Sequence, residues 1–301
     1  MTQLPGPEAY RSLFLEPDWA HQRYHGWHVV REEAGGRVLE KRIGPLTRRL
    51  ILAEGLDAGR LASLAGPGEG AWCQTVLHDF DASGRPSDWR PPAGYRPGEE
   101  ADLLLNTLTL VIDLQLPLEQ LQRNLRADFR RRIRQAEQAG LAFRVVAPEE
   151  GALLQLFFRQ LGQMGRRRGF GTPRLPVLQA MHTAGQAQLF VAERAGRPLS
   201  YLFVYLAGAG GLLMLSVAED DAPNEAGPFL HWQVICWLKA HGRRWYDLGG
   251  VPSQDLRDGI FCFKSGFGGR LTDLGREWVR EGRAYRAVAW LHGLAGRWRR
   301  K

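Results

Sequence analysis

Cysteine and long apolar runs are scarce in this sequence. The three cysteines, Cys73, Cys236 and Cys262, lie far apart among apolar residues. An odd number at such spacings argues against a disulfide framework or a zinc knuckle and predicts reduced thiols in the core. No stretch approaches the ~18 consecutive apolar residues of a membrane-spanning helix, and the first residues lack the basic start and apolar core of a secretory signal. These absences predict a folded protein of the cytoplasm.

Motifs for metal binding and for a serine nucleophile are also missing. The eight histidines are scattered, and their only cluster, HQRYHGWH, is interrupted by Gly26 and does not hold ligand spacing along a helix. The sequence contains no G-x-S-x-G nucleophile elbow. We therefore expect no metal site.

Hydrophobic residues and positive charge are abundant. Hydrophobic residues make up 44% of the 301 residues, enough for one large core or two of ordinary size. The 40 lysines and arginines, nearly all arginine, exceed the 32 acids and give a net charge of +8. Such a balance suits a phosphate-bearing partner or an anionic membrane surface.

The first half of the chain reads as strands followed by a helix. Residues 26–43 predict two strands around a glycine turn, and residues 70–78 and 107–114 predict two more, separated by a proline-rich loop at 80–100. Apolar residues then recur every three or four positions up to Gly140, which predicts one helix over 118–139. The positions that recur are Leu118, Leu121, Leu125, Phe129, Ile133 and Ala136.

The second half repeats this order. A helix at 151–165 precedes three strands at 188–194, 199–206 and 211–218, joined by glycine turns, and then a helix at 228–241 and a strand at 245–248. That order is typical of GNAT acyltransferase domains. We predict an α+β protein of two such units, residues 1–145 and 146–275, with a terminal helix at 276–301 that returns to the first.

Arginines are concentrated on the predicted helix at 118–139. Arg123, Arg126, Arg130 and Arg134 fall on one stripe opposite the leucine face. The stripe is either a phosphate-binding surface or a solvated helix face whose charge is partly paired by nearby acids. The pattern does not choose between the two.

The stretch RRRGFG, Arg166 to Gly171, matches the acyl-CoA pyrophosphate motif R-x-x-G-x-G. That motif acts where a strand leads into a helix amino terminus, so that backbone N–H groups meet the phosphates. Here it follows a helix, and the loop in the appropriate place, DDAPNEAGP, has no such motif. Its position therefore disfavours CoA binding by this stretch.

Lys264 lies between two phenylalanines in FCFKSGFGG, shortly after WYDLGG. It could extend from an apolar strand to solvent. Alternatively, a cation held among aromatic residues and glycines could stabilise negative charge on an acyl oxygen. Asp247 is the nearby acid, and its place at a strand end also fits a structural role.

Three blocks in this order resemble the Fem family (FemABX) of peptidoglycan interpeptide-bridge aminoacyl transferases, which have two GNAT-like domains. They are TLVIDLQLPLEQLQRNLRADFRRRIRQAEQAG, then RRRGF, then WYDLGGVP with GIFCFKSGFGG. A fainter match, WAHQRYHGW, has Arg23 where the family usually has lysine. The resemblance covers nearly the whole chain, although the long helical hairpin of some members, associated with tRNA handling, is absent.

The resemblance implies transfer of an amino acid from aminoacyl-tRNA to a stem-peptide amine, with no metal or bound cofactor. Lys264 would be the catalytic residue. Arg23 and Arg167 would contact the phosphates or sugar of a UDP-linked or lipid-linked muropeptide precursor, and an arginine at position 23 would bind phosphate as a fork rather than a point charge. The remaining substrate-binding candidates are Arg130, Phe263 and Gly268.

Two rival functions stay open. One is an acyl-CoA-dependent N-acyltransferase acting on a cell-envelope saccharide or amine, and the other is a non-catalytic RNA-binding protein that uses the arginine helix. The tail YRAVAWLHGLAGRWRRK carries apolar and basic residues. It is either an interfacial helix at the inner face of the membrane or a last helix packed on the first domain.

Overall fold

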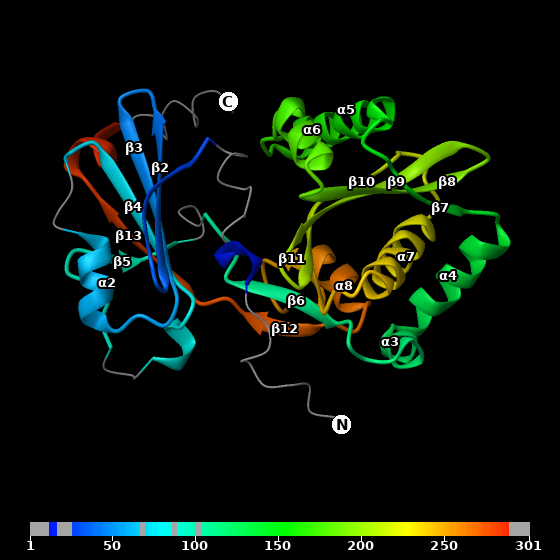
Figure 1. The fold of residues 1–301 in the computed structure, drawn as a ribbon, viewed down its shortest axis with the longest axis horizontal. Coiled ribbons are helices and arrows are strands. Elements are labelled where there is room, and N and C mark those ends of the chain that lie inside the picture. Colours follow the sequence, from blue (N-terminus) through cyan, green and yellow to red (C-terminus); the bar gives the residue numbers. More distant parts are fainter. Residues whose placement is uncertain (1–11, 17–25, 67–69, 86–88, 100–103, 289–301) are drawn as a thin grey trace. The chain divides into compact units, whose positions relative to one another are not determined.

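The computed structural model describes residues 12–16, 26–66, 70–85, 89–99 and 104–288. The chain divides into two compact units (Figure 1). Unit 1 comprises Met1–Tyr24 and Leu108–Thr272, and unit 2 comprises His25–Thr107 and Asp273–Lys301. We expected the two units to meet between residues 145 and 146, but both of these residues lie inside unit 1. Residues 108–145 belong there because their strands pair with strands from the second half of the chain.

Unit 1 is built on a seven-stranded mixed sheet in the order β12-β6-β11-β10-β9-β8-β7. Neighbouring strands in β7 to β10 run antiparallel, β10 and β11 are parallel, and β11 and β6 are antiparallel. The bounds are β6 (Leu108–Asp113), β7 (Ala142–Val145), β8 (Ala187–Arg194), β9 (Arg197–Ala207), β10 (Gly210–Ala218), β11 (Trp245–Gly250) and β12 (Arg270–Asp273).

The antiparallel meander β8–β9–β10 confirms the three strands expected at 188–218. Its turns use residues with positive φ, Ala195, Gly196 and Gly208, at 50°, 77° and 46°. Glycine adopts this backbone region without steric cost, which explains why the turns are glycine-rich. The helices α5 (Gly151–Arg168) and α7 (Ala226–Ala240) also lie where the sequence predicts them. The short helix α6 (Leu175–Thr183) was not predicted.

The helix expected over 118–139 is two helices, α3 (Leu118–Asn124) and α4 (Ala127–Gln138). Leu125 and Arg126 between them have extended backbones, with ψ of 141° and 143°. The N–H of Arg126 donates to the carbonyl oxygen of Gly266, 2.9 Å away. A long-range contact therefore interrupts a helix that the apolar periodicity alone predicts to continue.

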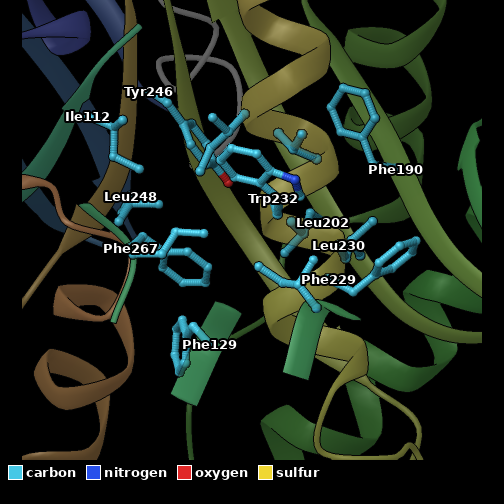
Figure 2. Close-up of a cluster of buried hydrophobic side chains, with 14 of the residues drawn as sticks. Ile112, Phe129, Phe190, Leu202, Phe229, Leu230, Trp232, Tyr246, Leu248 and Phe267 are labelled. Carbon is cyan, nitrogen blue, oxygen red and sulfur yellow. The ribbon is translucent and has the colours of Figure 1, made fainter. Parts of the chain in front are cut away.

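The core of unit 1 lies between the sheet and the helices α3, α4 and α7. In Figure 2, Phe129 from α4 and Phe267 lie next to each other, and Phe229, Leu230 and Trp232 project from α7. The rings of Phe129 and Phe267 meet edge to face, with centroids 4.9 Å apart. Edge-to-face pairs of this kind add to the burial energy of a core, so this end of α4 is firmly fixed.

Unit 2 is a six-stranded sheet in the order β1-β2-β3-β4-β13-β5, with α2 (Ala58–Ala65) packed on one face (Figure 1). The strands β3 and β4 are parallel and are joined through α2. The bounds are β1 (His28–Glu33), β2 (Gly36–Ile43), β3 (Leu46–Ala53), β4 (Cys73–Asp79), β5 (Arg96–Pro97) and β13 (Arg276–Glu281), with 3₁₀ turns η2 (Leu13–Leu15) in unit 1 and η3 (Ala82–Gly84) in unit 2.

Of two expectations for unit 2, one is confirmed and the other is wrong in part. The turn at Ala34–Gly36 and its two strands are confirmed as the β1–β2 hairpin. Residues 276–281, expected as the start of a terminal helix, are instead strand β13, which pairs with both β4 and β5. Residues 283–288 are helical, as expected for the tail, and the rest of the expected helix, 289–301, lies outside the described residues. No helix in the described part of the chain is long and apolar enough to cross a membrane.

Candidate active site

Lys264 lies on a short helix, α8 (Gly259–Ser265), rather than on the strand that its apolar neighbours suggested. Asp258 caps the start of α8 by accepting the N–H of Phe261 at 2.8 Å. The ammonium group at the other end returns to β11, where Nζ donates to the carbonyl oxygens of Gly249 at 3.1 Å and Gly250 at 2.8 Å. The backbone of β11 thus fixes the position of the amine.

Gly249 is shaped to receive this lysine. Its φ is +74°, a conformation that favours glycine. A Cβ at this position would lie 2.9 Å from the carbonyl oxygen of Leu213 and 3.6 Å from Lys264 Nζ. The glycine pair after WYDL therefore lets the strand end, the neighbouring strand and the amine approach one another closely.

Burial makes the amine of Lys264 less basic. The low-dielectric surroundings disfavour the charged form and lower its pKa to about 8, an effect that the nearby Asp247 carboxylate partly opposes. An ammonium group has three N–H bonds, and the two carbonyl contacts use two of them. The third position can donate to a substrate oxygen when the amine is charged.

Asp247 stabilises the end of β11. Its carboxylate is buried, and it accepts hydrogen bonds from the hydroxyl of Thr109 on β6 and from the N–H of Gly249 at 2.8 Å. These contacts hold the irregular end of β11, where the register against β6 shifts between Asp247 and Gly250. The structural role considered for this acid from sequence matches these contacts.

A buried histidine lies behind Lys264 and was not singled out from the sequence. His231 of α7 is 1% exposed, and its Nδ1 lies 3.1 Å from the hydroxyl of Tyr246. Burial, with a smaller contribution from the positive charge of Lys264, lowers the pKa of His231 to about 3. The imidazole is therefore neutral at physiological pH. The available signal was one histidine in the apolar run PFLHWQV.

The small residues after Lys264 let α8 approach the α3–α4 break. A Cβ at Gly266 would lie 2.7 Å from the ring of Phe129, and one at Gly268 would lie 2.4 Å from the carbonyl oxygen of Asn124. Phe263 packs beside them, with its ring 5.5 Å from that of Phe129. The structure thus brings the candidates Phe263 and Gly268 together with Lys264, and both make core contacts there.

Arg130 belongs to the same region, but its guanidinium is engaged. Its Nη1 donates to the carbonyl oxygen of Arg123 at 2.9 Å and to that of Leu125, so it caps the end of α3. Arg126 pairs with Asp128 at 2.5 Å. The continuous helix expected for the arginine stripe is wrong, but Arg123, Arg126 and Arg134 are exposed and Arg126 is paired by a nearby acid, as the solvated-face alternative expects.

The other two phosphate-binding candidates are not part of this cluster. Arg167 lies at the end of α5, where its guanidinium forms an exposed ion pair with Asp220 at 2.6 Å. Arg23 lies outside the described residues. Within the described ranges no group of three histidine, cysteine or acidic side chains could hold a metal ion.

Comparison with known proteins shows what this chain is similar to. Residues 123–260 match the acetyltransferase (GNAT) domain family. A UDP-N-acetylmuramoylpentapeptide-lysine N(6)-alanyltransferase from Weissella viridescens is 29% identical over 131 residues, which are 42% of this chain and 38% of that relative. The crystal structure of FemX superposes with a TM-score of 0.69 and 15% identity, over 93% of this chain and 94% of that one. The chain has the GNAT fold and is similar to Fem proteins, so we refer to it below as Fem-like.

The resemblance to the Fem family and the expected α+β fold of two GNAT-like domains are thereby confirmed. The C-terminal domain of a putative lysylphosphatidylglycerol synthetase from Agrobacterium fabrum shares the fold of this Fem-like protein, with a TM-score of 0.62 and 16% identity over 90% of this chain and 89% of that one. The sequence match to the Weissella viridescens relative spans 38% of that protein's length.

Proposed function

We propose that this Fem-like protein is an aminoacyl transferase that moves an amino acid from aminoacyl-tRNA to a side-chain amine of a peptidoglycan precursor. The observation that carries the proposal is the position of the Lys264 ammonium group. Two backbone carbonyls accept two of its N–H bonds, and the third N–H can donate to a substrate oxygen. The similarity to the Weissella viridescens UDP-N-acetylmuramoylpentapeptide-lysine N(6)-alanyltransferase supports this substrate class.

The chemistry needs positioning and one oxyanion donor. The acceptor amine attacks the ester carbonyl carbon of the donor, giving a tetrahedral intermediate with a negative oxygen. The bond to the ribose oxygen then breaks, an amide forms, and the proton lost by the amine balances the one taken up by the ribose hydroxyl. Orientation of the two substrates contributes about 7–11 kcal/mol to such a reaction. One preorganised donor such as Lys264 contributes about 3–4 kcal/mol.

Two features argue against acyl-CoA as the donor. The R-x-x-G-x-G stretch follows the carboxyl end of α5, where a helix presents carbonyl oxygens rather than N–H groups. The loop that does lead into the amino terminus of α7 carries four acids, which repel a pyrophosphate. They are Glu219, Asp220, Asp221 and Glu225.

The further assignments follow from this proposal. Lys264 is the catalytic residue, and Arg23 and Arg167 contact the phosphates of a UDP-linked or lipid-linked precursor. Exchange of the Asp220 ion pair for a substrate phosphate would release Arg167 for that contact, because the pair is exposed and therefore weak. No resident cofactor takes part, and a lipid-linked precursor would bring the protein to the inner face of the membrane.

The test incubates the purified protein with total tRNA charged with labelled amino acids and a panel of UDP-linked pentapeptide precursors. Labelled acetyl-CoA is supplied in a parallel reaction, and each reaction is repeated with lipid-linked precursor in detergent. Label passing from tRNA to a precursor, lost in Lys264→Ala, supports the proposal and identifies the amino acid. Product from acetyl-CoA alone, or no product from any donor and acceptor pair, contradicts it.

A further inference from the structure

Unit 2 has a hollow of its own beside strand β13, which is labelled in Figure 1. The hollow has a volume of about 580 Å³, and η3, residues 89–97 and β13 form its walls. We call it the β13 hollow. The chemistry proposed at Lys264 of unit 1 does not use it. Its lining includes Arg85, Trp89, Arg90, Tyr95, Arg276 and Trp278.

Three aromatic side chains that line the β13 hollow each enclose a polar atom without a hydrogen-bond partner. The atoms are Nε1 of Trp89, Nε1 of Trp278 and the hydroxyl oxygen of Tyr95. Thr75 is a polar neighbour of Tyr95, but the two side chains do not meet in hydrogen-bonding geometry. Buried indole N–H and tyrosine O–H groups usually find a partner, and an unmet one costs free energy. In the described part of the chain no other buried side-chain nitrogen or oxygen lacks a partner, so the unmet groups are concentrated at this hollow.

Packing holds these three aromatic side chains together. The ring centroids of Trp89 and Trp278 are 5.5 Å apart, and both side chains pack on the apolar cluster that contains Tyr95. The guanidinium carbon of Arg85 lies 4.8 Å from the centroid of the Trp89 ring, and that of Arg280 lies 4.7 Å from the centroid of the Tyr95 ring. A cation over an aromatic face is attracted to it, so two arginines help to fix the wall of the hollow.

The charged side chains of the described lining are all basic. Arg90 and Arg276 are exposed. Arg85 is paired with the buried carboxylate of Asp79, to which its Nη2 donates at 2.9 Å. The lining therefore offers hydrogen-bond donors and positive charge beside aromatic surface. Such a site suits a small molecule that has acceptor oxygens, negative charge and an apolar face.

We propose that the β13 hollow binds a small organic acid whose ring lies against the aromatic wall. Its carboxylate accepts hydrogen bonds from Arg276 and from the indole N–H groups, because a carboxylate has room for several donors and fits an arginine fork. The ring is either aromatic or that of a sugar acid, and the probes below distinguish the two. The inference is independent of the proposed transfer reaction.

Binding requires a movement of the aromatic wall. The indole N–H groups of Trp89 and Trp278 are enclosed, so these side chains have to turn towards the carboxylate before they can donate to it. Each N–H gains by this turn a partner that it otherwise lacks, and the ligand therefore favours the turned arrangement.

An NMR titration of the full chain, with ¹⁵N-labelled tryptophan, tests the proposal. The probes are 2-naphthoate and glucuronate, each beside a neutral counterpart, 2-naphthalenemethanol and methyl glucoside, at up to about 10 mM because molecules of this size bind weakly. The indole N–H signals of Trp89 and Trp278 are assigned by their loss in Trp89→Phe and Trp278→Phe. Both should move downfield with at least one acid and stay in place with its neutral counterpart. The signal of Trp72, a half-exposed residue of unit 2, should not move.

Two substitutions remove the proposed donors to the carboxylate. Arg276→Gln and Trp278→Phe should each weaken the acid about tenfold, since a hydrogen bond to a charged group contributes at least that much. Trp278→Phe keeps an aromatic ring in the wall and removes only the N–H and part of the ring surface. The matched controls, Arg42→Gln and Trp72→Phe, make the same changes at exposed positions of unit 2 and should leave the affinity unchanged.

Tyr95→Phe separates binding from folding. It should weaken the acid but leave the urea midpoint of the free protein no lower than that of the wild type, because the hydroxyl that it removes has no partner. The control is Tyr285→Phe, in the same unit. Its hydroxyl donates to Oε1 of Gln74 at 3.0 Å, so its removal should lower the midpoint.

Shifts with naphthoate support an aromatic acid as the ligand, and shifts with glucuronate support a sugar acid. The inference is overturned if neither acid moves the two indole signals, if the neutral counterparts move them equally, or if Arg276→Gln and Trp278→Phe bind as tightly as their controls. A midpoint that falls as far in Tyr95→Phe as in Tyr285→Phe also counts against it, because the Tyr95 hydroxyl would then have a partner such as a buried water. Loss of aminoacyl transfer, by contrast, would affect only the proposed function.

Discussion

Lys264 Nζ lies 2.8 Å from the carbonyl oxygen of Gly250, so the amine at the end of α8 is held by the main chain of β11. Asp247, the nearby carboxylate, is itself held by Thr109 and the N–H of Gly249. The amine is thus anchored on main-chain oxygens, and a substitution at Lys264 changes no other side chain that holds it.

Replacing Lys264 by alanine should lower turnover by about 10²–10³-fold, the cost of one oxyanion donor, while the fold is retained. The matched control is Lys239→Ala. Lys239 Nζ also donates to two backbone carbonyls, those of Leu114 and Leu116, each at 2.8 Å. The control should lose stability and keep turnover in the folded fraction. Comparable turnover in the two variants would remove Lys264 from the mechanism.

The rate should fall as pH rises through about 8, because the lowered pKa of Lys264 means that its ammonium loses a proton there. Lys264→Arg should move this limb to higher pH, since a guanidinium stays charged across the range. Initial transfer rates between pH 6.5 and 9.5 provide the profile, corrected for spontaneous ester hydrolysis. A limb that stays at the same pH in the arginine variant would belong to another group.

Stability should fall in acid partly through His231. Its pKa is about 3 in the folded protein against 6.5 for an ordinary histidine. The unfolded chain therefore binds a proton between those values that the native protein does not. Above pH 6.5 the residue is neutral in both states and does not affect the pH dependence, and between pH 6.5 and about 3 stability falls by about 1.4 kcal/mol for each pH unit.

Urea unfolding between pH 4 and 7 measures this contribution. The His231→Phe variant should show an acid slope shallower by about one proton than the wild type. Comparison of the slopes rather than the absolute free energies removes the cost of leaving the Tyr246 hydroxyl without its partner. Parallel slopes would mean that His231 titrates normally and is not fully enclosed.

Gly268→Ala should destabilise unit 1 strongly. The residue has φ of +74°, and an added Cβ would lie 2.4 Å from the carbonyl oxygen of Asn124. Gly242→Ala is the control, with φ of +71° and nothing within 4 Å of the new Cβ. The control should cost only the backbone term of about 1–2 kcal/mol, and Gly268→Ala should cost clearly more. Equal midpoints in urea would show that α8 can move away from α3.

The sequence predicts those elements whose signals are local. The meander β8–β9–β10 shows long apolar runs between glycine turns, and α7 shows a continuous apolar run of helical length, so both were expected correctly. The strand β3 was missed because two arginines interrupt the apolar pattern of LTRRLILA, and α2 was missed because AGRLASLA is short, although Asp57 and Gly66 cap its two ends. The elements with strong local signals were therefore enough to predict the fold class.

The candidate site was harder to predict from the sequence because contacts between residues far apart in the chain set its geometry. The break at Leu125–Arg126 depends on a hydrogen bond to Gly266, and the amine of Lys264 depends on carbonyls more than ten residues away. Neither contact can be inferred from the spacing of apolar residues along a helix. His231 could be recognised only once α7 placed it against Tyr246 and the α8 aromatic residues.

Strand β13 has a consequence for synthesis of the chain. It lies between β4 and β5, yet it follows the whole of unit 1 along the sequence. As the ribosome releases the chain, β4 emerges early and presents an open hydrogen-bonding edge until Arg276–Glu281 arrive. Unpaired edges of this kind invite association with other nascent chains. Unit 1 can close first, and any message cut short before codon 276 would yield a protein with an unfinished second sheet.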